Sequence, residues 1–317
     1  MLNKIKEKIG GVNRLFSFKK ENISKIKGWF KKENLSKIKD WFKKENLSKI
    51  KGWFKKENWR QYAFISVVLL AIVMLIVNAV SNKAEEKVFS EQQQQIQEQK
   101  EMVETAETEE GGILPEYEAL YNQNSDMIGW LTIENTIIDY PVMQTMEDEQ
   151  YYLRRSFEKE DNQNGCLIMD TDSIVGEGSR EYGYTETKEP STNLIIHGHN
   201  MKAGTMFGKL YLYEKEAYGK EHNIICFDSL YEKREYELIS VFYSQVYYQH
   251  EEVFKYYKFF QANTQEEFED WYNNIKQMSL YDTGVEAKLG DEFITLSTCS
   301  YHVEDGRFVV VGKRRTN

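Results

Sequence analysis

The sequence predicts a mainly β domain, a sandwich or a barrel, carried behind a single N-terminal transmembrane helix. Short apolar, β-branched runs separated by turn-rich segments recur from Ile113 onward, and helical periodicity is rare there, which predicts the β class. An uninterrupted apolar segment between Arg60 and Lys83 predicts the membrane helix. With 317 residues, of which 41% are apolar and only three are proline, the chain can bury at least one sizeable core.

Charge divides the chain at that apolar segment. Residues 1–60 carry 19 Lys and Arg against 6 Asp and Glu, a formal charge of +13, so the net charge of −10 leaves −23 on the rest. Residues 61–82, as a helix rising about 1.5 Å per residue, span the roughly 30 Å hydrocarbon core of a bilayer. The h-region of a secretory signal peptide is shorter, so we expect an uncleaved anchor. The basic flank predicts a cytoplasmic N-terminus and places residues 83–317 outside the cell membrane.

The basic head, residues 1–60, contains a twelve-residue repeat over residues 18–59, which begins as FKKENISKIKGW. Twelve residues at about 100° each move the apolar stripe by about 120° per repeat, which favours short broken helices over one straight amphipathic helix. Three roles stay open: a solvated charged tail, a segment that binds anionic lipid while its Trp and Phe enter the headgroup layer, and a nucleic-acid-binding segment. We favour the lipid role and expect no nucleic acid partner.

The extracellular part begins with a polar segment and continues with short strands. Residues 83–112 are rich in Gln and Glu, lack proline and end in Gly-Gly, which predicts a helical stalk. The runs that follow include IGWLTI, GCLIMD, NLIIHGH, NIICFD, EFITLSTC and RFVVVGK. Residues 264–281 depart from this pattern with apolar residues at helical spacing, which predicts one helix packed on the core. The spaced residues are Phe268, Trp271, Tyr272 and Ile275.

The three cysteines differ in their surroundings. An odd number outside the membrane leaves at least one thiol free or paired with another chain. Cys166 and Cys226 lie within apolar strands, where a cysteine is ordinarily a small buried hydrophobe. Cys299 ends the run TLSTC, and polar residues follow at once. We therefore expect Cys299 to be a nucleophile at the rim of the sheet.

A cysteine nucleophile needs a partner that raises its thiolate fraction or carries its proton, and histidine is the usual partner. His222 and His250 lie in connecting segments and are expected at the surface. His197 and His199 both end the run NLIIHGH and share one face of the strand, so periodicity does not choose between them. His302, in the loop after the cysteine, is a third candidate.

Taken in order, these motifs resemble those of the sortases, the membrane-anchored cysteine transpeptidases of Gram-positive bacteria. TLSTC is followed by an arginine before FVVVGK, and about a hundred residues earlier a strand ends in GHNM. The resemblance is closest to class B and covers most of residues 113–317, including NSDMIGWLTIENTIIDYPVMQ and NMKAGTMFGKL. It implies a closed β-barrel of about eight strands, with N-terminal helices and an added helix before the cysteine-bearing strand.

The resemblance also implies residue roles. The family's catalytic histidine, cysteine and arginine fall on His199, Cys299 and Arg307, and Ser297 matches a position that lines the substrate groove. The repeats have no counterpart in the family pattern. We see no Gly-rich phosphate loop and no carboxylate cluster to assign to calcium, so we expect no cofactor and no metal.

The implied activity requires Arg307 near Cys299. If Asp305 and Gly306 formed a two-residue hairpin turn, Arg307 would pair with Glu304 and lie far from the thiol. A wider loop, residues 300–306, brings both strand ends to one rim. We expect the wider loop, because acyl transfer passes through an oxyanion that a fixed guanidinium stabilises.

The expected reaction is cleavage of a C-terminal sorting signal, similar to LPXTG or NPQTN, on secreted surface proteins. A thioester would form, and an amine of a peptidoglycan precursor would then take the acyl group. Three alternatives stay open: a lysine acceptor, as in pilin polymerisation, water as the acceptor, and an inactive binding module whose cysteine is structural.

Overall fold

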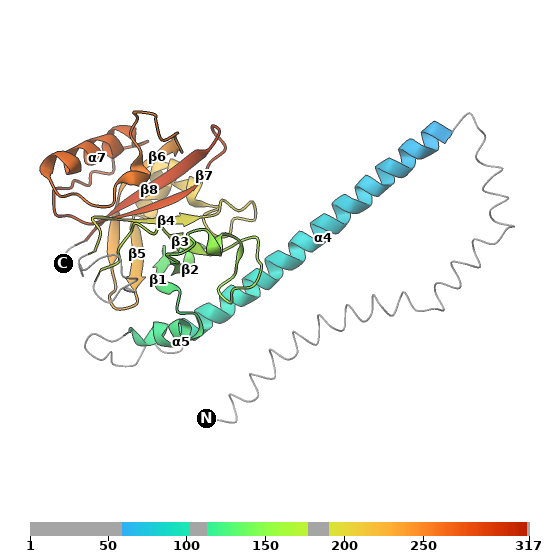
Figure 1. Ribbon diagram of the computed structural model, residues 1–317, viewed down its shortest axis with the longest axis horizontal. Coiled ribbons are helices and arrows are strands. Elements are labelled where there is room, and N and C mark those ends of the chain that lie inside the picture. The colour runs from blue at the N-terminus through green and yellow to red at the C-terminus, as the bar shows by residue number, and fades with distance from the viewer. Residues whose placement is uncertain (1–58, 102–112, 177–189, 316–317) are drawn as a thin grey trace, which may run out of the picture. The chain divides into compact units, whose positions relative to one another are not determined.

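The computed structural model describes residues 59–101, 113–176 and 190–315 (Figure 1). The basic head therefore lies almost wholly outside the described residues, and its repeats stay a prediction. The chain divides into two units, Met1–Val80 and Ser81–Asn317.

Helix α4 (Trp59–Glu101) contains the apolar segment that the sequence assigned to the membrane. In that part of the helix the large apolar side chains, among them Phe64, Leu70 and Val77, are exposed. Among the described helices it is the one long and apolar enough to cross a bilayer, judged by length and composition. An apolar surface without protein cover is what lipid contact requires.

The last turns of α4 pack within the Ser81–Asn317 unit. Phe89 and Ile96 are buried, and the Gln97 side chain donates a hydrogen bond to the Asp139 carbonyl at 2.9 Å. The Lys100 ammonium lies 4.6 Å from the centre of the Trp130 ring. This part of the predicted stalk is thus helical and packed on the barrel along one side. Where stalk and catalytic domain divide stays a prediction.

Eight strands close into a barrel in the order β1-β2-β3-β4-β7-β8-β6-β5, which confirms the fold that the resemblance implied (Figure 1). The β2–β3 and β4–β7 pairs are parallel and the others antiparallel. Closure leaves no free sheet edge. The strands are β1 (Met127–Thr132), β2 (Asp139–Met143), β3 (Leu167–Met169), β4 (Asn193–Gly198), β5 (Ile224–Ser229), β6 (Glu235–Gln245), β7 (Phe293–Cys299) and β8 (Gly306–Arg314).

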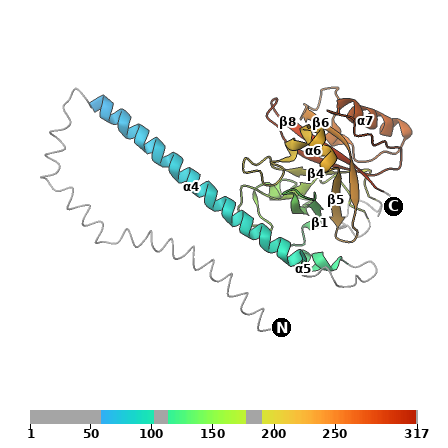
Figure 2. The ribbon, with the colours of Figure 1, turned by 180° about the vertical axis from the view of Figure 1, so that it is seen from behind.

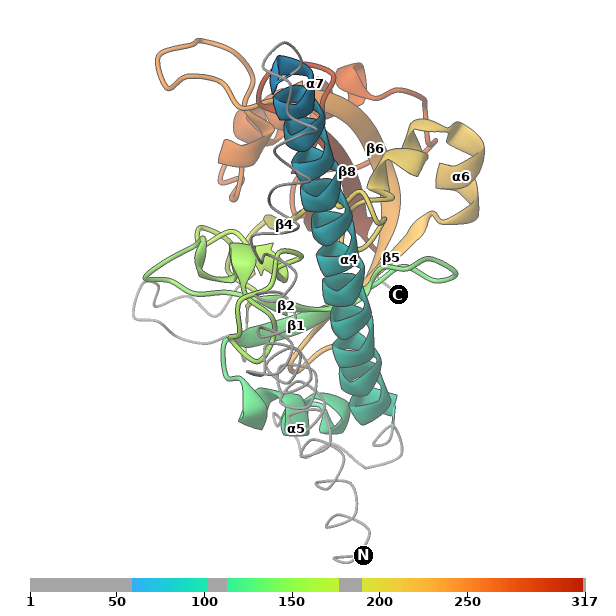
Figure 3. The ribbon, with the colours of Figure 1, turned by 90° about the vertical axis from the view of Figure 1, so that its right-hand side faces the viewer.

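One short helix precedes the first strand, and the other short helices lie between strands. Helices α5 and α7 lie at opposite ends of it in each view (Figure 2, Figure 3). The helices are α5 (Pro115–Gln123), α6 (Glu216–Glu221) and α7 (Gln265–Met278), and the 3-10 turns are η1 (Tyr151–Arg154), η2 (Leu210–Glu214) and η3 (Tyr256–Lys258).

Helix α7 is the helix that the sequence predicted before the cysteine-bearing strand. Thr264 and Glu267 form a capping box at its start. Phe268, Trp271 and Ile275 are buried against the outer face of the β6–β8–β7 sheet. Tyr272, the fourth predicted residue, is partly buried and stacks on the Phe268 ring at 5.5 Å.

Strand alternation sends neighbouring residues of β7 and β8 to opposite sides of the sheet. Leu296 and Val310 belong to the core inside the barrel. Phe293, Val309 and Val311 belong to the outer cluster beneath α7. Every second residue from Phe293 therefore faces outward, and the last of that series is Cys299. The barrel wall thus presents the predicted nucleophile on its outer face.

At the start of α5 a buried carboxylate forms an ion pair with an exposed lysine. Glu116 is 6% exposed, and its Oε1 lies 2.7 Å from the Lys233 ammonium. Burial alone would raise the pKa of Glu116, but the hydrogen bond and charge of Lys233 outweigh burial and hold the pKa below its usual 4.5. The ionised carboxylate therefore stabilises the fold above pH 4.5, and this contribution is lost as the pH falls through the folded-state pKa.

We expect Glu116→Gln to lower the free energy of unfolding by about 1–2 kcal/mol at neutral pH, because a neutral amide oxygen replaces the charged acceptor of the Lys233 ammonium. The difference from the wild type should shrink as the pH falls below 4.5. Thermal melts across that range measure it. Glu118→Gln, an exposed site in the same turn, is the matched control. A difference that is independent of pH would contradict the assignment.

Candidate active site

The thiol and the guanidinium lie opposite each other at one end of the β7–β8 hairpin. Cys299 pairs with Arg307 in the antiparallel register, so their side chains share a face with Cβ atoms about 4.5–5.5 Å apart. The connecting loop is therefore the wide one, and a two-residue turn at Asp305-Gly306 does not form. The prediction of the wider loop is confirmed.

Backbone hydrogen bonds close this loop. The Ser300 amide donates to the Gly306 carbonyl at 2.8 Å, and the Gly306 amide donates to the Val303 carbonyl at 3.2 Å. A Cβ at Gly306 would collide with the Ser300 carbonyl, so the close approach of the two backbones requires glycine. The loop thus holds the strand ends together.

His199 lies one residue beyond the end of β4, on the other side of β7. The parallel β4–β7 register ends at Gly198 opposite Thr298, so one further step would place His199 opposite Cys299. The Asn200 side chain donates to the Cys299 carbonyl at 2.8 Å, which ties the two segments together. Strand spacing is about 4.8 Å, so the imidazole and the thiol belong to neighbouring positions of one rim.

A carbonyl of η1 orients the His199 ring. His199 Nε2 lies 2.7 Å from the Leu153 carbonyl oxygen. Because a carbonyl oxygen only accepts hydrogen bonds, Nε2 carries the proton of the neutral ring and Nδ1 keeps its lone pair. Nδ1 is therefore the nitrogen free to exchange a proton with a nearby group.

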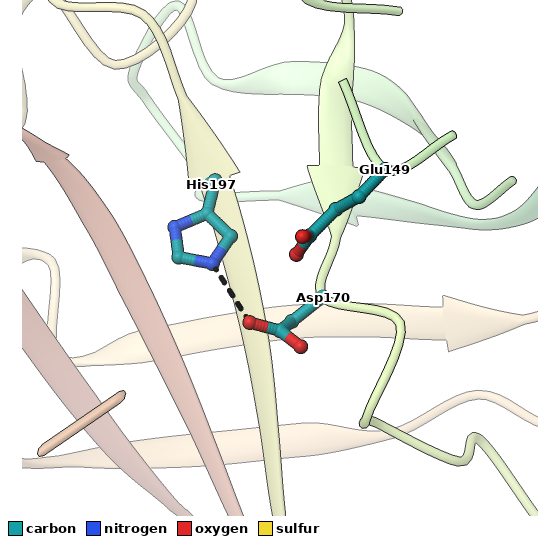
Figure 4. A group of neighbouring side chains, drawn as sticks. All are labelled: Glu149, Asp170 and His197. Atoms are coloured by element: carbon teal, nitrogen blue, oxygen red, sulfur yellow. Dashed lines mark hydrogen bonds and ion pairs between the residues drawn. The ribbon is translucent and has the colours of Figure 1, made fainter. Parts of the chain in front are cut away.

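The other two histidine candidates are held elsewhere. His197 Nε2 lies 3.3 Å from Asp170 Oδ2, and Glu149 reaches toward the same point (Figure 4). His302 Nδ1 lies 3.0 Å from Ser300 Oγ, and its ring packs against Tyr243. These contacts favour His199 as the partner of the thiol.

The carboxylates and imidazole of Glu149, Asp170 and His197 could together hold a cation. Their ligand atoms lie within 4.8 Å of one another, and Glu149 is exposed. Burial of part of the side chain and the charge of Asp170 raise the pKa of the Glu149 carboxyl. Ligands that share one ion at about 2.1 Å stand roughly 3 Å apart, so these side chains would have to close around it. The expectation of no metal stays a prediction.

Arg307 directs its hydrogen bonds toward its own turn. Nη1 donates to the carbonyls of Asp305 and Gly306 at 3.1 and 3.0 Å. Within the described residues no ion pair joins Arg307 to a carboxylate. A guanidinium has five N–H donors, so most of them remain for a substrate or another side chain.

Ser297 lies one row below the cysteine on the outer face and is 1% exposed. Its Oγ is 2.8 Å from the Tyr256 hydroxyl. Burial raises the pKa of Tyr256 to about 12, so that hydroxyl stays protonated at neutral pH. The predicted contact of Ser297 with substrate stays a prediction. Sequence reasoning missed Tyr256, because nothing in the loop between β6 and α7 marks it.

The remaining thiols contrast with Cys299, which is exposed. Cys166 is buried, and burial raises the pKa of its thiol. Cys226 is half-buried, and burial together with nearby carboxylates raises the pKa of its thiol also. Both thiols therefore have a small thiolate fraction at neutral pH.

Comparisons with known proteins place this chain near one family. The family described as "Sortase domain" matches residues 131–315. Sortase B of Listeria monocytogenes is 33% identical over 206 residues, which cover 64% of this chain and 75% of that protein. Sortase B of Staphylococcus aureus is 27% identical over 260 residues, which cover 80% of this chain and 98% of that protein.

Solved structures show the same likeness. Sortase B from B. anthracis in complex with AAEK1 has a TM-score of 0.60 at 27% identity, over 74% of this chain and 99% of that chain. The Staphylococcus aureus sortase B-substrate complex has a TM-score of 0.59 at 26% identity, over 74% of this chain and 98% of that chain.

Proposed function

This chain belongs to the sortase family of cysteine transpeptidases, and from that premise we propose that it cleaves a C-terminal sorting signal and transfers the acyl group to an amine. The observation that carries the proposal is the rim of the β4–β7–β8 sheet. There Cys299 lies opposite Arg307. The side chain of Asn200, the neighbour of His199, donates a hydrogen bond to the Cys299 carbonyl.

The first half-reaction forms a thioester. The Cys299 thiol gives its proton to Nδ1 of His199, and its sulfur attacks the scissile carbonyl carbon. N–H groups of Arg307 donate to the oxyanion that develops. The tetrahedral intermediate collapses, the protonated His199 gives a proton to the departing amine, and the acyl group remains on sulfur.

The second half-reaction transfers the acyl group. An acceptor amine attacks the thioester carbonyl while His199 takes the amine proton, and Arg307 again donates to the oxyanion. Loss of the thiolate forms the new amide, and His199 returns the proton to Cys299. One amide is exchanged for another, so the transfer needs no nucleotide.

The substrate we propose is a secreted protein with a sorting signal similar to LPXTG or NPQTN, and the acceptor is an amine of a peptidoglycan precursor. A similar solved structure is named as a Staphylococcus aureus sortase B-substrate complex, which supports the binding of a substrate by this fold. A lysine of another protein, as in pilin assembly, and water remain alternative acceptors.

We further propose that residues 61–82 anchor the enzyme in the cell membrane with the N-terminus in the cytoplasm. The exposed apolar helix and the basic residues that precede it support this orientation. Sorting-signal proteins and cell-wall precursors would then meet residues 113–317 outside the membrane.

The proposal is tested with the full chain in detergent micelles, a panel of sorting-signal peptides and an amine acceptor. We expect a ligated product by mass spectrometry, with a cleaved peptide only when the amine is omitted. Cleavage without ligation under every acceptor would make the protein a peptidase. The absence of any adduct on Cys299 would leave only the inactive binding module.

We expect Arg307→Lys to raise the acylation barrier by about 2.7–4 kcal/mol, since the charge remains but the planar fork of donors is lost. This corresponds to roughly a hundredfold or more in rate. Single-turnover thioester formation measures it, and thermal melts check folding. If Arg307 had only a surface role, the change would leave the rate as it is and alter stability by well under about 1 kcal/mol.

A further inference from the structure

Ser244 lies on the far side of Arg307 from the nucleophile. In the β6–β8 register Ser244 pairs with Arg307, and in the β7–β8 register Arg307 pairs with Cys299. Opposed residues of an antiparallel pair point to the same face. The three side chains therefore form one row across β6, β8 and β7 on the outer face of the barrel.

The next row confirms this direction. Phe242 pairs with Val309, and both belong to the cluster outside the barrel. Ser244 follows Phe242 by two residues, so alternation places it on the same face. The ring of Tyr256 packs edge-on against Phe242 at 5.8 Å.

The Ser244 hydroxyl is buried without a hydrogen-bond partner. The residue is 5% exposed, and its Oγ has no partner among the described residues. A buried hydroxyl left unpaired destabilises the fold, whereas an alanine there would not. The Tyr256 hydroxyl lies 2.8 Å from Oγ of Ser297, a residue of the next row. Along its own row, Ser244 has Arg307 as its neighbour and Cys299 beyond it.

Arg307 is the neighbour of Ser244 whose guanidinium has N–H groups left to donate. Its two hydrogen bonds use only Nη1 and end on carbonyls of its own turn. To act on a carbonyl held at Cys299, the guanidinium must be fixed in the plane of the row. Two strand spacings, roughly 9.6 Å, separate β6 from β7, so a guanidinium on β8 has one neighbour on each side.

We propose that Ser244 is a positioning residue for Arg307, and that its hydroxyl accepts a hydrogen bond from the guanidinium when a substrate carbonyl lies beside Cys299. The inference rests on the proposed function, in which Arg307 acts on that carbonyl. A bond on the β6 side leaves the remaining N–H groups directed to the β7 side. The fork is thereby held in the geometry that an oxyanion needs.

The test compares Ser244→Thr with Ser244→Val in the full chain. These two side chains have nearly the same shape, but only threonine carries a hydroxyl. We expect the valine variant to form the thioester about tenfold more slowly than the threonine variant in single turnover, with KM for the peptide unchanged. Ser244→Ala should likewise form the thioester about tenfold more slowly than the threonine variant. Thermal melts report whether each variant is folded.

A double-mutant cycle separates positioning from packing. In an Arg307→Ala background, exchanging threonine for valine at 244 should leave the acylation rate unchanged, because the group that the hydroxyl holds is gone. Ser156→Ala is the matched control. That serine is also buried with an unpaired hydroxyl, and it lies between η1 and β3 and not on the β6–β8–β7 row. We expect its acylation rate to equal that of the wild type.

Three outcomes would overturn the inference. Equal rates of thioester formation for the threonine and valine variants would show that the hydroxyl does not position the Arg307 guanidinium. An equal loss in the Arg307→Ala background would show that Ser244 acts independently of the arginine. Arg307→Ala acylating at the wild-type rate would remove the proposed role of Arg307 together with that of Ser244. In the first two cases the proposed function itself stands.

Discussion

Replacing Cys299 with alanine is expected to abolish thioester formation, with a loss on the order of 10⁴-fold or more in peptide cleavage. The variant lacks the only exposed thiol of the described residues. Water would then have to attack the peptide directly, without a covalent intermediate. Intact-mass measurement of the enzyme after incubation with a sorting-signal peptide detects the acyl adduct or its absence.

Cys226→Ala is the matched control for that experiment. Cys226 is a second thiol that is not fully buried, and its raised pKa leaves it a poor nucleophile. We expect this variant to form the adduct at the wild-type rate. An adduct that persists in Cys299→Ala and disappears in Cys226→Ala would show that the nucleophile is Cys226 on β5, and the assignment to Cys299 would be wrong.

The second large effect is expected at His199. His199→Ala should slow single-turnover acylation by about 10²- to 10⁴-fold, since it removes the group that takes the thiol proton and returns it to the departing amine. The substrate KM should change less than kcat. Quenched-flow measurement with one sorting-signal peptide separates the two parameters.

His197→Gln is the control, because His197 lies on the same strand face two residues earlier. Its ring is paired with Asp170, at 3.3 Å from Nε2 to Oδ2 (Figure 4). We expect its acylation rate to stay within about threefold of the wild type, which is under about 0.7 kcal/mol. Comparable losses for both histidines would mean that the two rings act together, and the assignment to His199 alone would be wrong.

Much of the fold was predictable because it depends on local periodicity. Alternation in runs such as EFITLSTC and RFVVVGK marks strands, and 3.6-residue spacing over 264–281 marks α7. Composition alone marked the apolar helix that begins near residue 61. Periodicity did not show that the polar stalk packs against the barrel, since Phe89 and Ile96 are two of only a few apolar residues in a polar run.

The candidate site was predictable only in part. Motif resemblance named His199, Cys299 and Arg307, yet the residues between Cys299 and Arg307 were compatible with a tight turn or a wide loop. The β7–β8 register settled that question. Strand alternation left His197 and His199 equivalent, and the pairing of His197 with Asp170 distinguishes them in the structure.

The sequence by itself determined the β class, the membrane helix, α7 and the identity of the residues at the strand ends, because each depends on neighbours within a few positions. Only the tertiary structure decided which residues meet. Asn200 and Cys299 are 99 positions apart, His199 and Leu153 are 46 apart, and Tyr256 and Ser297 are 41 apart. Such contacts follow from barrel closure and strand register, which are set by the packing of all the strands together and leave no local pattern in the chain.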